Sequence, residues 1–473
     1  MFTSTARRLP RLARRSVLLV ICILCLAFSA ISASAQMGGN PPAGDPPAGA
    51  PPGGGGPGAD SGTNPVLNST CGAVLLDGTT GETAADASYD SATTDVSALC
   101  LINGATLDLT NVTVTKTGDT SSDENSSFYG LNAGVLVGSG SSFTMTGGTV
   151  TTEGSGTNGV FSTGEGTTVT LTDVTIEAVG NGAHAVMATQ GGAMTLVNVD
   201  MLTTDAHSGA VATDRGSGTI AVTGGEITTT GTDSPGLYST GVITVDGATV
   251  HSTGAEVVVI EGANSVILTD TDLVSSFADK WGVMLYQSFS GDAEGSEGVF
   301  TMTGGSLAYT SETGPLFFIT NATGTITLSD VEVSVGSGVL GLASATERWG
   351  TSGANGGHLV LIADEQSLNG DFVADAISTL SITLTNSSTL TGAVNADDAA
   401  ARAQVTLDAT SLWTLTADSY LTSVSGMHIS GDSITNISGN GFNLYYDATD
   451  AANSALNAGT YALVNGGSLL PST

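Results

Sequence analysis

Apolar residues alternate with threonine in a short phrase that recurs along the middle of the chain. In Val169–Thr172 the order is Val-Thr-Leu-Thr, which is the two-residue period of a half-buried β-strand. Gly-Gly, or Asp followed by Val or Gly, then interrupts the alternation, and a second short strand such as Val174–Ile176 follows. Gly permits positive φ and Asp bonds its own backbone, so both favour a corner here. Copies of the phrase begin at Leu107, Phe143, Val169, Met194, Ile220, Ile243, Val266, Phe300 and Ile326.

A third apolar segment follows each phrase about ten residues later, as in Ala185–Thr189 and Gly209–Thr213. Most copies start 23 to 26 residues apart, and a repeat of this length that cannot bury its own apolar face predicts a solenoid. Each coil should contain three strands and three corners. No segment beyond residue 40 has an apolar stripe at helical spacing, so the predicted fold class is all-β.

Stacked coils repeat every ~4.8 Å, the hydrogen-bonding distance between strands. Residues 66–473 then predict roughly sixteen coils in a rod about 75 Å long. The core would be a column of aliphatic side chains, in agreement with 40 % hydrophobic but only 5 % aromatic residues. We attribute the threonine columns to β propensity on a solvated face. Outward Thr-x-Thr pairs also resemble ice-binding solenoids, but Val197, Ala221, Asp246 and Ile267 interrupt the array.

The first 35 residues are typical of a secretory signal peptide. Five arginines precede an apolar run from Val17 to Phe28, and the first 35 residues contain no acid. Ala33-Ser-Ala35 follows the run as a small-x-small cleavage site. We therefore expect a secreted or cell-surface protein with no membrane-spanning segment after cleavage. Residues 36–65 are rich in Pro and Gly and predict a flexible linker.

Cys71 and Cys100 are the only cysteines after the signal peptide. An oxidising compartment and an even count favour a disulfide between them, near the first coil. Reduced buried thiols are the alternative.

The repeat period, the Thr-rich alternation and the stretch from Ser411 to Tyr420 resemble the right-handed parallel β-helix family. This is the fold of pectin-lyase-like enzymes and of autotransporter passenger domains. The resemblance covers about residues 66–473, with a regular β-helix and three insertions over 66–381. Heavier C-terminal coils and a cap are expected over 382–473. It implies a fold rather than a function, because this fold has many roles, and no outer-membrane barrel pattern follows.

The polygalacturonase and pectate-lyase site patterns are largely missing from this chain. Of the first set only an acidic pair, Asp397-Asp398, occurs, and the basic residues that the second set needs are scattered. Asp214 and Arg215, at an expected corner, are the catalytic candidates that remain, and a simple surface ion pair is the alternative. Asp173, Asp270 and Asp330 are candidate calcium ligands, although Asx turns explain them without metal.

All 44 acidic residues and only five basic residues follow residue 35, which gives this part of the chain a net charge of −39. Such a field repels nucleic acid, anionic lipid and polyuronate substrates.

Three segments break the repeat period and are predicted to be loops: Lys116–Tyr129, Ser275–Gly298 and Ala343–Gly357. Binding commonly resides in loops on a rigid scaffold. Two of them contain tryptophan beside a basic residue, and we expect these candidate binding residues there: Lys280, Trp281, Tyr286, Arg348 and Trp349. The alternative is that the aromatic rings pack the loops against the rod.

These observations favour a non-enzymatic adhesin or structural spacer that presents binding loops to a carbohydrate or a surface or matrix protein. The alternative is a polysaccharide lyase or glycoside hydrolase of the pectin-lyase-like fold. No cofactor is expected apart from the calcium considered above.

Overall fold

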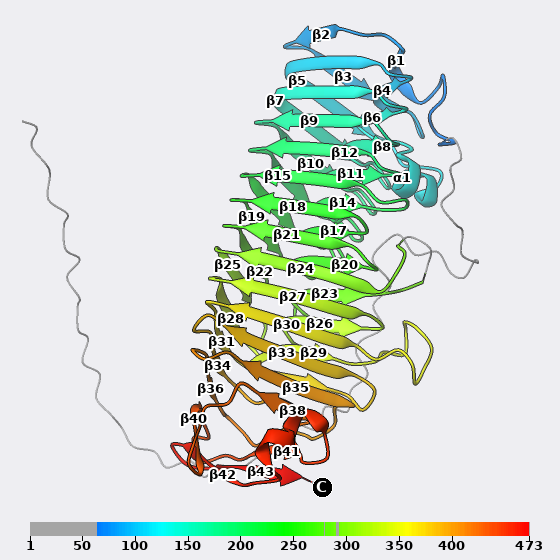
Figure 1. The fold of residues 1–473 in the computed structure, drawn as a ribbon. Helices are drawn as coiled ribbons and strands as arrows, with labels where there is room; N and C mark the ends of the chain where they lie inside the picture. Colours follow the sequence, from blue (N-terminus) through cyan, green and yellow to red (C-terminus); the bar gives the residue numbers. More distant parts are fainter. Residues whose placement is uncertain (1–63, 279, 290–292, 473) are drawn as a thin grey trace, which may run out of the picture. The chain divides into compact units, whose positions relative to one another are not determined.

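The computed structural model describes residues 64–278, 280–289 and 293–472. The expected parallel β-helix is confirmed: three strands form each coil, and about sixteen coils are stacked along one axis (Figure 1). The expected signal peptide and nearly all of the expected linker lie in residues 1–63, outside the described residues. No helix in the described part of the chain is long and apolar enough to cross a membrane.

The first side of the solenoid, called face A here, is a twelve-stranded parallel sheet that later strands extend. Its sheet strands are β1 (Gly72–Asp77), β4 (Ser97–Ile102), β6 (Val135–Gly138), β8 (Val160–Thr163), β11 (Val186–Thr189), β14 (Val211–Thr213), β17 (Leu237–Ser239), β20 (Val258–Glu261), β23 (Val283–Tyr286), β26 (Phe317–Thr320), β29 (Val339–Ala343) and β32 (Asp371–Ala374). The extension consists of a bridge at Val394 and strands β37 (Ser419–Leu421), β41 (Leu444–Asp447) and β43 (Ser468–Ser472).

The second side, face B, contains the Thr-rich phrase. Its strands are β2 (Glu82–Ala85), the first halves of β5 (Thr106–Thr117) and β7 (Ser142–Glu153), β9 (Thr168–Thr172), β12 (Ala193–Val197), β15 (Thr219–Thr223), β18 (Val242–Asp246), β21 (Ser265–Thr269), β24 (Glu297–Thr303), β27 (Thr323–Ser329), β30 (His358–Asp364), β33 (Thr379–Thr385), β35 (Arg402–Leu407) and β38 (Ser423–Ser425).

The third side, face C, contains the second strand of the phrase. Its strands are β3 (Ser88–Ser91), the second halves of β5 and β7, β10 (Thr175–Val179), β13 (Asp200–Thr203), β16 (Glu226–Thr229), β19 (Thr249–Ser252), β22 (Asp272–Ser275), β25 (Ser306–Tyr309), β28 (Glu332–Val335), β31 (Ser367–Asn369), β34 (Thr389–Thr391), β36 (Leu412–Thr414), β40 (Ser433–Ser438) and β42 (Tyr461–Val464).

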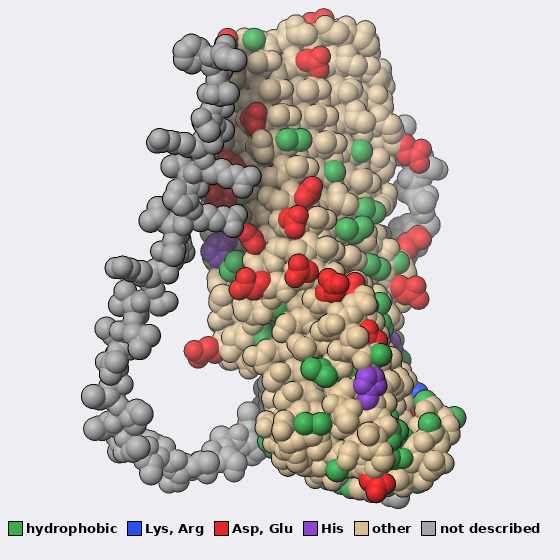
Figure 2. All heavy atoms as spheres, turned by 60° about the vertical axis from the view of Figure 1, so that its left-hand side comes forward, with side chains coloured by type: hydrophobic (Ala, Val, Ile, Leu, Met, Phe, Trp, Pro, Cys, Tyr) green, Lys and Arg blue, Asp and Glu red, His purple; other side chains and the backbone are tan. Residues whose placement is uncertain are grey.

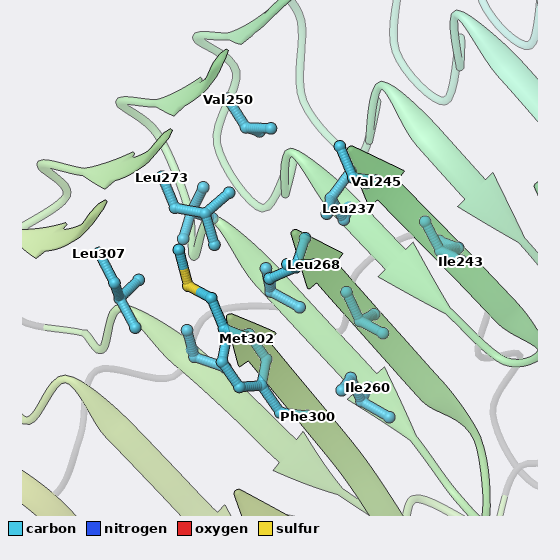
Figure 3. Packing of buried hydrophobic residues seen from close by; sticks show 14 of the residues in the cluster. Leu237, Ile243, Val245, Val250, Ile260, Leu268, Leu273, Phe300, Met302 and Leu307 are labelled. Carbon is cyan, nitrogen blue, oxygen red and sulfur yellow. The ribbon is translucent and has the colours of Figure 1, made fainter. Parts of the chain in front are cut away.

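Parallel pairing in strict register aligns equivalent apolar residues into columns. On face B, for example, Ile220 pairs with Ile243, which pairs with Val266 of the next coil. Side chains from all three faces meet inside the triangle of each coil, as Figure 3 shows for Leu237, Ile243 and Val250. Because the two-residue period directs alternate side chains outward, faces B and C bury one side only. The side of the solenoid seen in Figure 2 carries scattered acidic side chains and almost no basic ones.

Two kinds of corner join face B to face C. Asp173 adopts a left-handed φ of 54°, and the following Val174 is buried in the core. Where Gly224-Gly225 stands instead, both glycines have positive φ, and a Cβ added at Gly225 would lie only 2.3 Å from the oxygen of Val199. The Gly-Gly corner therefore brings the backbones of adjacent coils closer than a side chain permits.

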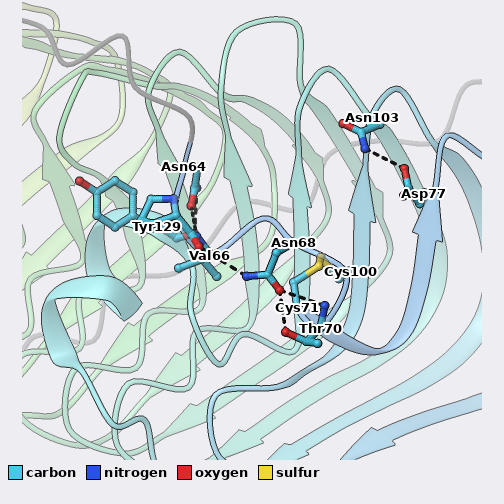
Figure 4. Close-up of a disulfide and its surroundings, with 10 residues drawn as sticks. Asn64, Val66, Asn68, Thr70, Cys71, Asp77, Cys100, Asn103 and Tyr129 are labelled. Atoms are coloured by element: carbon cyan, nitrogen blue, oxygen red, sulfur yellow. Dashed lines mark hydrogen bonds between the residues drawn. A yellow bond between two sulfur atoms is a disulfide. The ribbon is translucent and has the colours of Figure 1, made fainter.

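The two ends of the described solenoid are fastened differently. A disulfide joins Cys71 to Cys100 in the next coil, with Cα atoms 5.9 Å apart (Figure 4). Asn64, at the end of the expected linker, donates to the carbonyl oxygen of Tyr129 at 3.1 Å. At the C-terminal end β39 (Ile429–Ser430) and β40 pair antiparallel, as do β42 and β43, and a 3-10 helix, η1 (Ala451–Leu456), packs beside β38. The buried Trp413 indole donates to the oxygen of Gly392.

We predict that Gly225→Ala lowers the free energy of unfolding by about 2 kcal/mol or more, because the new methyl group meets backbone at a strained φ. Gly247→Ala is the matched control: its φ is 67°, but no atom lies within 4 Å of the added Cβ. Only backbone strain, about 1 kcal/mol, is expected there. Thermal unfolding followed by circular dichroism measures both variants, and equal losses would contradict this account of the corner.

Candidate functional site

All three expected insertions converge on the outer surface of face A. On its strands, residues alternate between the main core and a second apolar cluster outside the sheet; Val258 and Ile260 point inward, and Val259 outward. One aromatic residue from each insertion packs against this outer cluster: Tyr129, Trp281 and Trp349. In Figure 1, α1 (Asp123–Tyr129) and the yellow loop after β29 project on the same side. The three insertions therefore lie on the same face of the solenoid, at different levels along it.

The first insertion contains the short helix α1. The sequence did not predict this helix, because the segment has no apolar stripe at helical spacing. The Ser122 side chain caps its first turn, and Gly130 ends it with a φ of 79°. Helix and sheet are joined by the Thr189 hydroxyl, which donates to the Phe128 oxygen at 3.0 Å, and by Asn158, which donates to the Ser126 oxygen at 3.1 Å. This insertion is thus fixed to face A by buried hydrogen bonds.

The side chains of Asp214 and Arg215, the catalytic candidates, make different contacts. Asp214 is fully buried, and its carboxylate accepts the backbone N–H of Arg215 at 2.7 Å. The Arg215 guanidinium lies 3.8 Å from the ring centre of Phe128 and 3.8 Å from the Glu124 carboxylate. Phe128 and Glu124 both belong to α1. Arg215 therefore helps to hold the first insertion against the solenoid.

The second period break, Ser275–Gly298, consists of two loops with a regular strand between them. Strand β23 occupies its place in face A and pairs with β20 and β26 in register. The first loop therefore lies at the edge between faces C and A, and the second at the edge between A and B. A single large loop, as the sequence predicted, is not what the structure contains.

Lys280 and Trp281 hold the first of these loops against the rod. The Lys280 ammonium forms an ion pair with Asp233, and both side chains are mostly buried. Trp281 stacks on Phe318 of β26 with ring centres 4.0 Å apart. Burial raises the pKa of the neighbouring Glu256 carboxyl, and the Lys280 charge partly opposes this rise. These contacts favour the packing alternative for both residues.

Tyr286 lies within β23 and is only 3 % exposed. Its hydroxyl and that of Tyr238 each donate to the same carboxylate oxygen of Glu261 at 2.7 Å. The Ser288 hydroxyl donates to the other oxygen of Glu261. Three donors on one carboxylate stabilise its charged form. The cluster joins three successive coils of face A, at β17, β20 and β23, to the loop after β23.

Loops from two different coils meet at the edge between faces A and B. Asn321, after β26, donates to the oxygen of Gln287 in the loop after β23 at 2.6 Å. The Asn321 backbone N–H donates to the Asn355 oxygen, in the loop after β29, at 3.2 Å. Asn321 therefore joins the two loops.

In the loops at this edge Phe289 and Arg348 are exposed and Trp349 is half-buried, and we call these three residues the loop patch. Phe289 is 67 % exposed, the largest exposure among the large hydrophobic residues exposed in the described chain. The exposed Arg348 has its guanidinium carbon 5.0 Å from the Trp349 ring centre. The Trp349 ring in turn lies 4.9 Å from that of Tyr286. The Arg348–Trp349 pair thus rests on Tyr286 of β23, and Phe289 lies in the loop that follows the same strand.

The candidate calcium ligands Asp173, Asp270 and Asp330 all occupy corners with left-handed φ. Asp173 accepts a hydrogen bond from the Asn198 amide at 3.2 Å. Within the described ranges, no group of three or more His, Cys, Asp or Glu side chains is placed to hold a metal ion. The backbone conformation accounts for these acids.

Comparison with protein-family models, with curated proteins and with solved structures finds no match for this chain. The class is therefore defined by the architecture itself: a parallel β-helix with three strands per coil.

Sequence reasoning missed Phe289 and Glu261. The sequence predicted one long insertion over Ser275–Gly298. It therefore gave no sign that Phe289 comes directly after a regular strand, β23. Glu261 ends an apolar run, Val257–Ile260, and only the register of face A places it beside two tyrosines from adjacent coils. The signal available was its repeat position, which matches that of Tyr286 one coil later.

His184, at the edge between faces C and A, has an environment that links folding to pH. It is 3 % exposed, and its Nδ1 lies 2.8 Å from the Gly209 oxygen, so this nitrogen carries the proton. Burial lowers the pKa of His184 to about 4. The unfolded chain therefore binds a proton between about pH 6.5 and pH 4 that the folded chain does not, and stability falls as the pH decreases through this window.

We predict that His184→Gln removes part of the pH dependence of stability between pH 6.5 and pH 5. The full effect of the shift is about 3 kcal/mol and is complete only below pH 4. Urea unfolding at several pH values measures it. His358→Gln, at an exposed histidine, is the control and should leave the slope unchanged; an unchanged slope in His184→Gln would contradict the assignment.

Proposed function

We propose that the protein is a secreted or cell-surface β-helix that binds a carbohydrate or an extracellular protein through the loop patch of Phe289, Arg348 and Trp349. The observation that carries this proposal is the junction at Asn321, which holds loops from different coils together at one edge of face A. The coils serve as a rigid support that spaces and presents this patch.

The composition of the loop patch supports a binding role. Trp, Tyr and Arg are the residues most often responsible for the affinity of an interface. An aromatic ring with a flanking polar group also suits contact with a sugar. Trp349 is supported from below by Tyr286, so little side-chain freedom would be lost on binding.

Charge narrows the class of partner. With a net charge of −39 after residue 35, the surface repels polyanions at moderate ionic strength. A neutral carbohydrate, or a protein with a neutral or basic surface, fits this field better than nucleic acid or a polyuronate.

A polysaccharide lyase or glycoside hydrolase is the second candidate. Asp214 and Glu261 occupy the same outward column of face A, two coils apart, or about 10 Å between backbones. However, the two residues are 0 % and 1 % exposed, and Glu261 is held by tyrosine hydroxyls. A substrate would have to displace these contacts, so binding is the better supported function.

We predict that Arg348→Ala and Trp349→Ala each weaken binding at least tenfold on an array of polysaccharides and extracellular matrix proteins, because truncated anchors typically cost 2 kcal/mol or more. Arg402→Ala and Leu412→Ala are the controls, since the Arg402 side chain is 43 % exposed and Leu412 is 51 % exposed, and they lie on faces B and C, away from the loop patch. Circular dichroism establishes that each variant is folded.

Equal binding by the patch variants and the wild type would place the binding surface elsewhere on the coils. Release of oligosaccharides from any arrayed polysaccharide, with loss of this release in Glu261→Gln, would establish the enzymatic candidate instead.

A further inference from the structure

The first coil of the solenoid presents three strands that are paired on one side only. Within the described ranges, β1 pairs with β4, and both β2 and β3 pair with β5. Asp86 N–H donates to the Thr110 oxygen of the second coil. Because successive residues of a strand direct their N–H groups to opposite sides, Thr83 and Ala85 direct theirs away from the stack. Such an edge is a template for pairing with another strand.

Glu82 occupies an inward position in this coil. It stands at the head of a face B column in which each coil contributes one residue, and the other thirteen residues are apolar. The column continues through Leu107, Phe143, Val169, Met194, Ile220, Ile243, Val266, Phe300, Ile326, Leu361, Ile382, Val405 and Val424. Glu82 itself is exposed. An inward-pointing charge is one of the known devices that prevent edge strands from pairing.

The remaining charges at this end have the same sign. Asp77, Asp86 and Asp90 are exposed in or beside the edge strands, and no basic residue occurs from Gly72 to Thr115. The second coil contributes another acid, Asp108, next to Thr83. Its one basic residue, Lys116, is fully buried beside Ser91. The Lys116 ammonium donates to the Thr117 and Gly118 oxygens. Within the described part of the first two coils, no exposed basic side chain therefore compensates these acids.

We infer that the N-terminal coil is a pairing surface for a second copy of this chain, kept unoccupied by the charge of Glu82 and its neighbouring acids. A two-fold axis perpendicular to the solenoid would bring two such coils edge to edge with their strands antiparallel. The contact is isologous, since the same triangular outline and the same three strands face each other. Among the described residues, repulsion between the two acidic rings opposes this contact, and the unpaired backbone donors and acceptors of the two edges favour it.

The test neutralises this ring. The variant Glu82→Gln/Asp86→Asn/Asp90→Asn keeps side-chain shape and removes three charges. Light scattering after size-exclusion chromatography should show a dimer that forms at a concentration at least tenfold lower than for the wild type. High salt should shift the wild type in the same direction, because the Debye length falls to about 3 Å at 1 M.

Two controls locate the contact. Glu177→Gln/Glu226→Gln/Asp246→Asn removes the same charge from exposed positions of interior coils and should leave the wild-type association unchanged. Adding Thr83→Pro to the neutralised variant removes an outward N–H and should abolish the dimer. A neutralised variant that stays monomeric, a dimer that survives Thr83→Pro, or equal dimerisation in the interior control would each overturn the inference.

Discussion

Parallel pairing between coils, in strict register, is the constraint on which the rest of this molecule depends. One coil cannot enclose a core, so each apolar side chain is buried by its counterparts above and below it. The columns that result leave no freedom at the corners, where the chain must turn within two residues in every coil. This explains why left-handed Asx residues and Gly-Gly pairs recur at the same position. A change at one corner therefore affects the backbone of the next coil, as the close approach of Gly225 to Val199 shows.

The fold could be predicted from the sequence because the repeat unit is local. The alternation in Val169–Thr172 and the corner at Asp173 report the strand, the turn and the period without any knowledge of distant contacts. The insertions could not be predicted in this way. The positions of Trp281, Tyr286 and Trp349 depend on contacts across coils, with Phe318, Glu261 and Tyr286 respectively. Only the register of face A reveals that residues from three period breaks lie on the same face.

The scarcity of basic residues helps to separate structure from function. Lys116 and Lys280 are held by nearby carbonyl or carboxylate oxygens, and Arg215 contacts α1. Arg402 forms an ion pair with Asp450 beside η1, near the C-terminal end. Arg215, Lys280 and Arg402 thus join parts of the chain that are far apart in sequence, whereas Lys116 bonds the two residues that follow it. Arg348 lies on an exposed loop, with its guanidinium carbon 5.0 Å from the Trp349 ring centre.

A solenoid that ends must also avoid pairing with itself. In the described solenoid, each interior strand of face B is hydrogen-bonded on both edges by the neighbouring coils. On this face, only the terminal coils therefore present free edges. At the C-terminal end, antiparallel pairs and η1 turn the last strands back on themselves. At the N-terminal end, the described residues show no such closure, and an acid replaces the apolar residue of the core column. Closure at one end and charge at the other are two physical solutions to the same problem. The second is the more sensitive to solution conditions, because repulsion between exposed charges weakens with salt whereas hydrogen bonds of a closed hairpin do not.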